Sequence, residues 1–300
     1  MNNIKKYILI KNIKKNIKKN DIINNNNINN KELLFIGYSA YGDYLSLNGM
    51  TRYLLNFFKK IYYITEHINH IKYIEILYND ILDKINIYTY DNIDFILNKN
   101  KNNIIIFNQM LNNNKNLFLN DNNKNIYYNC DNNISKYLNN ENIIINQKNI
   151  SNSTSFYFNN GLNPGIINDY FYFKRNYFEE DKYYNFALNK INISPEDKYI
   201  IISELNNIKI NYDYIVKKNL KTINICNLVE QPLYLIKLLE NAEEIHLFEH
   251  SNALMIYYLQ ITNNFNYKNI IYLHLYVRNR GKSINDMYKF PKLTNWEFIE

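Results

Sequence analysis

The fold of this chain is decided by residues 33–58, LLFIGYSAYGDYLSLNGMTRYLLNFF. The first four of these residues are apolar and predict a buried strand, and the small residues within 37–42 predict a turn. Apolar residues then recur at near-helical spacing, so we expect a helix over residues 43–58. A strand, a glycine-bearing turn and a helix, in this order, are typical of the start of a doubly wound α/β domain.

Asp43 lies at the predicted amino end of this helix and at the carboxyl end of the strand before it. Ligands of doubly wound folds bind at that edge of the sheet, and helix N-termini favour negative groups. Two interpretations of Asp43 are open: a catalytic base facing a cleft, or an N-cap. A dinucleotide-binding fingerprint is not present, because Gly37, Gly42 and Gly49 are too widely spaced.

Short apolar runs alternate with amphipathic segments along the rest of the chain, which predicts mainly parallel sheets. We expect strands at residues 61–64, 85–88, 104–107, 199–203, 222–225, 245–248 and 270–277. We expect helices at residues 70–77, 93–97, 170–188, 232–239 and 251–260. The Asn-rich part between residues 108 and 159 gives weaker signals, with strands at 126–128 and 143–145 and a helix at 134–138.

Gly161-Leu162-Asn163-Pro164-Gly165 is the clearest break in the middle of the chain. We therefore predict an α/β protein with two doubly wound Rossmann-like domains and a cleft between them. The expected divisions are a low-complexity Lys/Asn-rich extension at residues 1–31, an N-terminal domain at 32–165 and a C-terminal domain at 166–300. We expect the extension to be disordered.

The composition is that of a globular protein, with 46% hydrophobic residues and a formal net charge of +7 over 300 residues. Much of the positive charge lies in the first twenty residues. These predict either an arm for nucleic acid or a membrane surface, or a solvated extension, which we favour. No run is long enough for a membrane span. Cys130 and Cys226 lack metal-site spacing and indicate a reducing, cytoplasmic compartment.

The pattern Gly42-Asp43, Asn48-Gly49 and Arg52 resembles the N-terminal loop of the heptosyltransferase-like glycosyltransferases, which have the two-domain GT-B fold. The family often has Pro where this chain has Asn48-Gly49. The resemblance implies that Asp43 is the general base that deprotonates the acceptor. It also implies binding of the acceptor by four residues, Gly42, Tyr44, Asn48 and Arg175.

The segment Glu249-His250-Ser251-Asn252 follows a predicted strand and precedes a predicted helix, a position suited to hold phosphate. In GT-B enzymes the corresponding turn contacts the nucleotide-sugar, so the resemblance implies that these four residues and Arg278 bind the donor. Relatives carry Asp-Ser-Ser or a similar sequence here, and Ser251 matches best. Ser251 as a simple N-cap and Arg278 in a solvated basic loop remain open alternatives.

His246-x-x-Glu249-His250 also has the spacing of an inverted zinc-protease motif, which predicts a zinc hydrolase if all three residues lie on one helix. A strand followed by a turn fits residues 246–250 better. No Asp-x-Asp motif appears in the chain, which argues against a metal-dependent glycosyltransferase.

These observations together predict a metal-independent glycosyltransferase with no cofactor. Its partners would be a nucleotide-sugar and a glycan or glycolipid acceptor, and nucleic acid is not an expected partner. We expect a cytoplasmic protein, with membrane contact through the Lys-rich extension as one option. The alternatives are a catalytically inactive GT-B-like binding protein, the zinc hydrolase and a nucleic-acid-binding protein that uses the Lys-rich extension.

Overall fold

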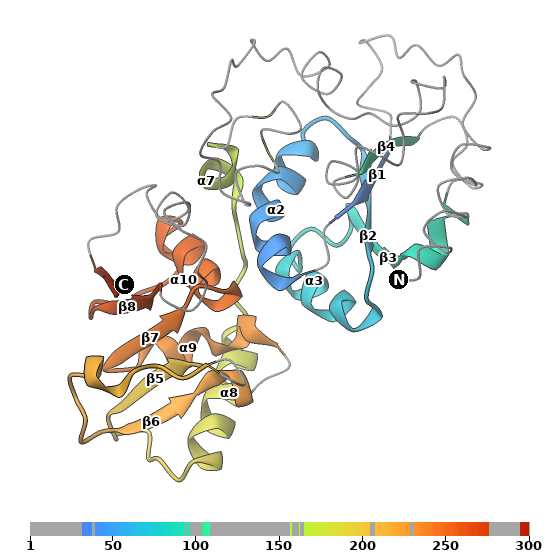
Figure 1. Ribbon diagram of the computed structural model, residues 1–300. Helices are drawn as coiled ribbons and strands as arrows, with labels where there is room; N and C mark the ends of the chain where they lie inside the picture. Colours follow the sequence, from blue (N-terminus) through green and yellow to red (C-terminus); the bar gives the residue numbers. More distant parts are fainter. Residues whose placement is uncertain are drawn as a thin grey trace. The chain divides into compact units, whose positions relative to one another are not determined.

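The computed structural model describes residues 32–37, 40–93, 95–96, 104–108, 157, 162, 165–204, 208–228, 231–275 and 295–299. The chain is an α/β protein with parallel sheets and divides into two compact units (Figure 1). Among the described residues, unit 1 ends at Tyr172 and unit 2 begins at Phe173. This division lies slightly C-terminal to the boundary expected at residue 165.

Unit 1 contains a four-stranded sheet, sheet A, in which every strand pairs in parallel with its neighbour. In spatial order the strands are β3 (Ile85–Thr89), β2 (Lys60–Thr65), β1 (Glu32–Ile36) and β4 (Ile104–Asn108). β1 is an inner strand, and residues 33–36 are buried on both faces, which is why they form a continuous apolar run in the sequence.

The two faces of sheet A carry different layers of the core. Tyr63 of β2 contacts α2 (Tyr41–Leu54) through the ring of Tyr44, and its ring also packs near Tyr78, which follows α3 (Ile71–Leu77). The opposite face packs against residues that follow β3. Its buried cluster consists of Leu34, Ile36, Tyr62, Ile64, Tyr90, Ile93 and Ile96.

Unit 2 contains a five-stranded parallel sheet, sheet B. In spatial order the strands are β6 (Lys221–Asn224), β5 (Tyr199–Ser203), β7 (Glu244–Phe248), β8 (Ile271–His274) and β9 (Trp296–Ile299). Its helices are α8 (Tyr177–Lys190), α9 (Ile236–Glu240) and α10 (Ser251–Ile261), with a 3-10 turn, η9 (Pro232–Leu235), before α9.

Alternation along β5 assigns its residues to the two faces of sheet B. The hydroxyl of Tyr199 donates to Leu238 O at 2.8 Å, so this face meets α9. Ile200 and Ile202 lie on the other face and pack against the connection between β5 and β6. In its described part, residues 208–220, this connection has a single 3-10 turn, Tyr212–Tyr214, and no α-helix.

Most expected elements are present with ends that differ by a few residues. The helix expected at 170–188 is wrong in one respect: α7 (Ile166–Tyr170) and α8 are separate. Between them the chain is extended, with Phe171 and Phe173 buried while Tyr172 is exposed, and the side chain of Asn176 caps the new helix. β9 was not expected. The elements expected between 108 and 159, Cys130, the extension at 1–31 and Arg278 lie outside the described residues.

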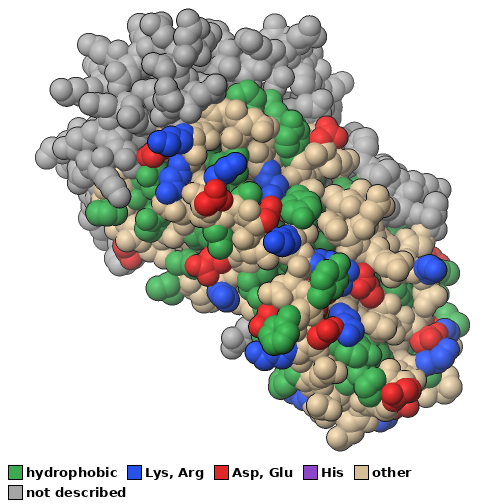
Figure 2. Space-filling model, turned by 180° about the vertical axis from the view of Figure 1, so that it is seen from behind, with side chains coloured by type: hydrophobic (Ala, Val, Ile, Leu, Met, Phe, Trp, Pro, Cys, Tyr) green, Lys and Arg blue, Asp and Glu red, His purple; other side chains and the backbone are tan. Residues whose placement is uncertain are grey.

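No helix in the described parts of the chain is long and apolar enough to cross a membrane. Acidic and basic side chains are interspersed on the face of the molecule in Figure 2.

Candidate functional site

In each unit, the strand order identifies one place at the carboxyl edge of the sheet where a ligand would bind. In sheet A the connections diverge between β1 and β4, and in sheet B they diverge between β5 and β7. Open α/β sheets bind ligands outside the carboxyl ends of the strands at such switch points, because the connections leave a crevice there. Asp43 lies near the first switch point, at the start of α2, and residues 249–252 lie at the second.

Asp43 is half-buried in the first turn of α2, three residues after the N-cap residue Ala40. It is therefore not the N-cap. Burial raises the pKa of its carboxyl to about 6, and a hydrogen bond from the Ala40 backbone opposes this shift. The Ala40 side chain makes no cap hydrogen bond, so this contact is half of a capping box. A carboxyl with this pKa exchanges its proton near neutral pH, as a general base requires.

Gly42 and Tyr44 both make contacts within unit 1. Gly42 is a helical residue whose carbonyl accepts from Ser46 Oγ at 3.0 Å. Tyr44 is fully buried, and its hydroxyl lies 2.7 Å from Thr65 Oγ1 and 3.0 Å from His70 Nδ1. These contacts favour a structural role for Tyr44 over the predicted contact with the acceptor.

A group of rings close to Asp43 in unit 1 was not predicted from the sequence. The ring of Tyr41 lies 4.7 Å from that of His70 and 4.6 Å from that of Tyr73, and His67 lies 4.9 Å from His70. His67 is exposed and His70 half-buried. Both histidines follow the carboxyl end of β2, and this position after a buried strand is the signal that could have identified them.

Asn48 has a packing role within unit 1. It is fully buried, and its Oδ1 accepts from Tyr172 N at 3.0 Å and from Arg52 Nε at 3.2 Å. Arg52 forms a bidentate pair with Asp80, at 2.9 and 2.8 Å. A methyl group on Gly49 would lie 2.8 Å from the carbonyl oxygen of Ile166. The Asn48-Gly49…Arg52 pattern therefore brings α2 and α7 into close contact.

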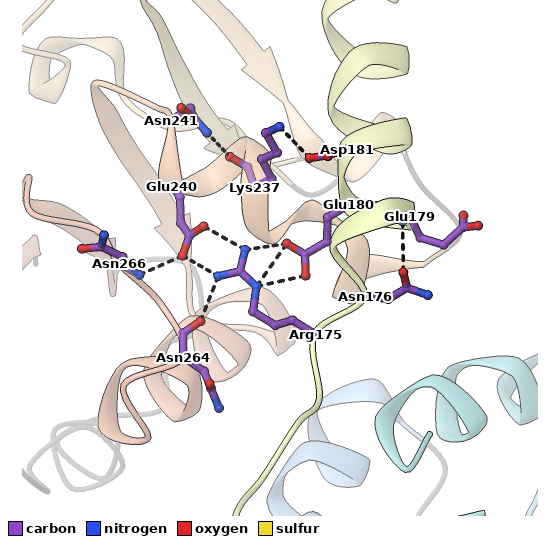
Figure 3. Close-up of polar contacts among 10 residues, drawn as sticks. All are labelled: Arg175, Asn176, Glu179, Glu180, Asp181, Lys237, Glu240, Asn241, Asn264 and Asn266. Carbon is purple, nitrogen blue, oxygen red and sulfur yellow. Dashed lines mark hydrogen bonds and ion pairs between the residues drawn. The ribbon is translucent and has the colours of Figure 1, made fainter. Parts of the chain in front are cut away.

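Arg175 is held inside unit 2 by two acids (Figure 3). Its Nε and Nη2 donate to Glu180, its Nη1 and Nη2 donate to Glu240 at 2.7 and 2.8 Å, and Nη1 also donates to Asn264 O at 3.2 Å. These bonds use all the donor groups of a guanidinium. They favour a structural role over the predicted binding of the acceptor.

At the switch point of sheet B, Ser203 at the end of β5 meets His250 at the start of α10. The distance from Ser203 Oγ to His250 Nε2 is 2.6 Å, and Asn252 Nδ2 donates to the same oxygen at 3.2 Å. Cys226 Sγ lies 3.2 Å from it. The structure therefore brings His250 and Asn252, both predicted, together with two residues that the sequence analysis missed.

The tautomer of His250 follows from its contacts. Its Nδ1 accepts the backbone N–H of Asn252 at 3.1 Å, so the neutral ring carries its proton on Nε2 and donates to Ser203. In this state His250 does not act as a base toward the serine. His250, and not Ser251, is the N-cap residue of α10. These groups bond to one another, and they are not arranged as a Ser-His nucleophile.

Glu249 is 6% exposed, and Ser251 is half-buried in the first turn of α10. A neighbouring acid, Glu204, accepts from Ile210 N at 3.1 Å and from Asn224 Nδ2 at 3.3 Å. Glu204 follows β5 and Asn224 ends β6, and this position at the carboxyl end of a strand is the general signal for this edge of the sheet.

The zinc-protease geometry is not formed. His246 lies within the strand β7 and His250 precedes α10, so the two rings are not on one helix face. Instead, His246 Nε2 lies 3.1 Å from Glu244 Oε2, and His246 Nδ1 lies 3.1 Å from His274 Nε2. Among the described residues, no group of three or more His, Cys, Asp or Glu side chains could hold a metal ion.

Comparison of the chain with protein-family models, with curated proteins and with solved structures finds no match in any of the three.

Proposed function

We propose that this protein is a metal-independent glycosyltransferase of GT-B type that transfers a sugar from a nucleotide-sugar to an acceptor hydroxyl. The observation that carries the proposal is Asp43, a half-buried carboxyl with a pKa of about 6 at the carboxyl edge of a parallel sheet. Its position suits a general base, and its pKa leaves it ionised near neutral pH while it can still accept a proton.

In the proposed reaction the acceptor oxygen forms a bond to the anomeric carbon while the bond from this carbon to the diphosphate breaks. Asp43 takes the proton of the acceptor hydroxyl, and the bonding electrons leave with the nucleoside diphosphate. The donor would bind at the switch point of sheet B, beside the N-terminus of α10, where Ser251 is half-buried.

The expected partners are a nucleotide-sugar and a glycan or glycolipid acceptor. We place the activity in the cytoplasm, and the free thiol of Cys226 agrees with a reducing compartment. A binding protein without turnover is the second candidate. The hydrogen bond from Ala40 favours it, because this contact gives Asp43 a capping role that needs no catalysis.

The test is release of nucleoside diphosphate from a panel of nucleotide-sugars, with binding measured by calorimetry. We expect Asp43→Asn to lower turnover at least ~100-fold while donor affinity is kept, since a base acts in the transition state. Asp83→Asn, at an exposed acid just before β3, is the matched control and should keep both. Binding without turnover by the unaltered protein would favour the second candidate, and no binding of any nucleotide-sugar would overturn both.

A further inference from the structure

Three titratable side chains form a hydrogen-bonded chain inside sheet B. Glu244 and His246 lie two residues apart on β7 and therefore on one face of the sheet, and His274 lies on the neighbouring strand β8. Their exposed fractions are 4%, 0% and 0%. Nothing in the proposed transfer reaction uses these residues. Buried ionisable groups are costly, so three in contact call for a physical account.

The proton positions in this chain follow from the acceptors. The Glu244 carboxylate can only accept, so His246 Nε2–H donates to it across 3.1 Å. The Nδ1 of neutral His246 is then an acceptor, and His274 Nε2–H donates to it across 3.1 Å. Both rings are therefore neutral in this arrangement. Burial lowers the pKa of His246, and burial together with His246 lowers the pKa of His274 to about 4.

The same carboxylate also holds the connection between β5 and β6. Glu244 accepts from Val216 N at 3.1 Å and from Lys217 N at 2.8 Å. The ring of Tyr214, from the same connection, lies 5.9 Å from that of His274. Because the described part of this connection has no α-helix, these contacts and the apolar packing of its isoleucines attach it to the sheet.

Other charged or titratable groups face the chain from the elements around it. Lys217, Tyr267 and Tyr272 interact electrostatically with Glu244, and Tyr272 also stacks on His246 at 4.5 Å. Glu297 of β9 interacts with Tyr272. Lys217 is itself paired with Glu243, which Lys198 also contacts. Among these described groups, Lys217 is held by Glu243. As a protonated amine, Lys217 cannot take up an added proton.

A first added proton can be accommodated. It binds His274, which passes its Nε2 proton to His246 Nδ1, so that an imidazolium of His246 pairs directly with the Glu244 carboxylate. A second proton cannot be accommodated in the same way. It would place two imidazolium rings 5.3 Å apart in the interior of the sheet, where like charges repel strongly.

We propose that the Glu244–His246–His274 chain is an acid-sensitive latch that holds residues 208–220 on sheet B and releases them when both histidines are protonated. This proposal is independent of the proposed transferase activity. Its pH window follows from the sign of the shifts. The folded pKa of His274 is about 4, below the ordinary 6.5, so the released form binds more protons over this range. Acidification from pH 6.5 toward pH 4 therefore favours release.

The test is hydrogen exchange of the full chain, followed by mass spectrometry on peptides that cover residues 208–220, from pH 7 to pH 4 with correction for intrinsic rates. We expect protection at pH 7 and its loss on acidification. His274→Gln keeps an N–H donor for His246 but removes the second titrating ring. It should shift the loss of protection to lower pH by about one unit or more.

Two further variants keep the test decisive. His274→Phe should shift the loss in the same direction, because it also leaves a single imidazole beside Glu244, and it serves if His274→Gln does not fold. His67→Gln changes an exposed histidine of unit 1 and should leave the midpoint unchanged. The latch is overturned if 208–220 loses protection at the same pH in the wild type and in the His274 variants, or if the wild type keeps its protection down to pH 4.

Discussion

The hydroxyl of Tyr63 packs directly against the backbone of Gly37, and a methyl group added to Gly37 would lie 2.7 Å from the hydroxyl oxygen. Tyr63 is fully buried, and among the described residues its hydroxyl has no hydrogen-bond partner. The contact lies at the carboxyl end of β1, directly before the turn that leads to Asp43. The glycine at this position is therefore required by its neighbour.

Gly37→Ala should destabilise unit 1 by about 1–3 kcal/mol, because a buried aromatic ring cannot move aside freely. Urea unfolding followed by far-UV circular dichroism measures the change. Tyr63→Phe removes the hydroxyl and should itself cost little, since that hydroxyl has no partner to lose. The double variant should recover part of the loss. A Gly37→Ala protein as stable as the wild type would show that the ring yields.

Arg175→Ala should destabilise unit 2 by about 3–5 kcal/mol, because it leaves the fully buried carboxyl of Glu180 without its ion-pair partner. The single tryptophan of the chain, Trp296, lies in β9 and reports on unit 2 by its fluorescence in urea. Lys182→Ala is the matched control. It breaks an exposed pair with Glu179 at 3.7 Å and should cost less than about 0.5 kcal/mol. Equal effects of the two variants would contradict a structural role for the Arg175 cluster.

Asp43→Asn should change the pH dependence of stability. The pKa of Asp43 in the folded protein, about 6, lies above its ordinary value of 3.8. The stabilisation that the protonated carboxyl contributes is therefore complete below pH 3.8 and is lost as the pH rises through 6. Asparagine stays neutral over this range. The stability of the variant relative to the wild type should therefore rise by on the order of 1–3 kcal/mol between pH 4 and pH 7. A difference that does not vary with pH would show an ordinary, solvated carboxyl.

Asn48→Ala should destabilise unit 1 by about 1–3 kcal/mol, because Tyr172 N and Arg52 Nε lose a shared buried acceptor. Asn48→Asp keeps the acceptor beside the Arg52 guanidinium and should cost less. Thermal unfolding of the wild type, Asn48→Ala and Asn48→Asp measures the order of their stabilities. If Asn48→Ala is as stable as the wild type, the packing role fails and the predicted contact with the acceptor regains support.

The strands were predictable because inner parallel strands are buried on both faces and appear as apolar runs such as Tyr199-Ile200-Ile201-Ile202. β9 was not predicted because only Ile299 of its four residues is buried, so its sequence WEFI is not a continuous apolar run. The break before α8 was also missed, since local periodicity does not show that Phe171 and Phe173 are buried alternately in an extended segment.

The candidate sites were predictable in place but not in detail. The position of Asp43 at the start of a helix follows from the strand-turn-helix order, whereas its place in the first turn depends on where the helix begins. The contact of Ser203 with His250 joins residues far apart in sequence, and only the pairing of β5 with β7 brings them together. Arg175 shows the converse: the family resemblance implied contact with the acceptor, whereas two acids hold its side chain within unit 2.

The Arg175 cluster also has a consequence for heat tolerance. One guanidinium joins the first turn of α8, the last residue of α9 and the carbonyl of Asn264 beyond α10. The free-energy cost of removing water from charged groups falls as temperature rises. The cluster therefore stabilises unit 2 more on warming, when much of the remaining structure weakens. Arg175 should therefore contribute more to the free energy of unfolding near the melting temperature than at low temperature.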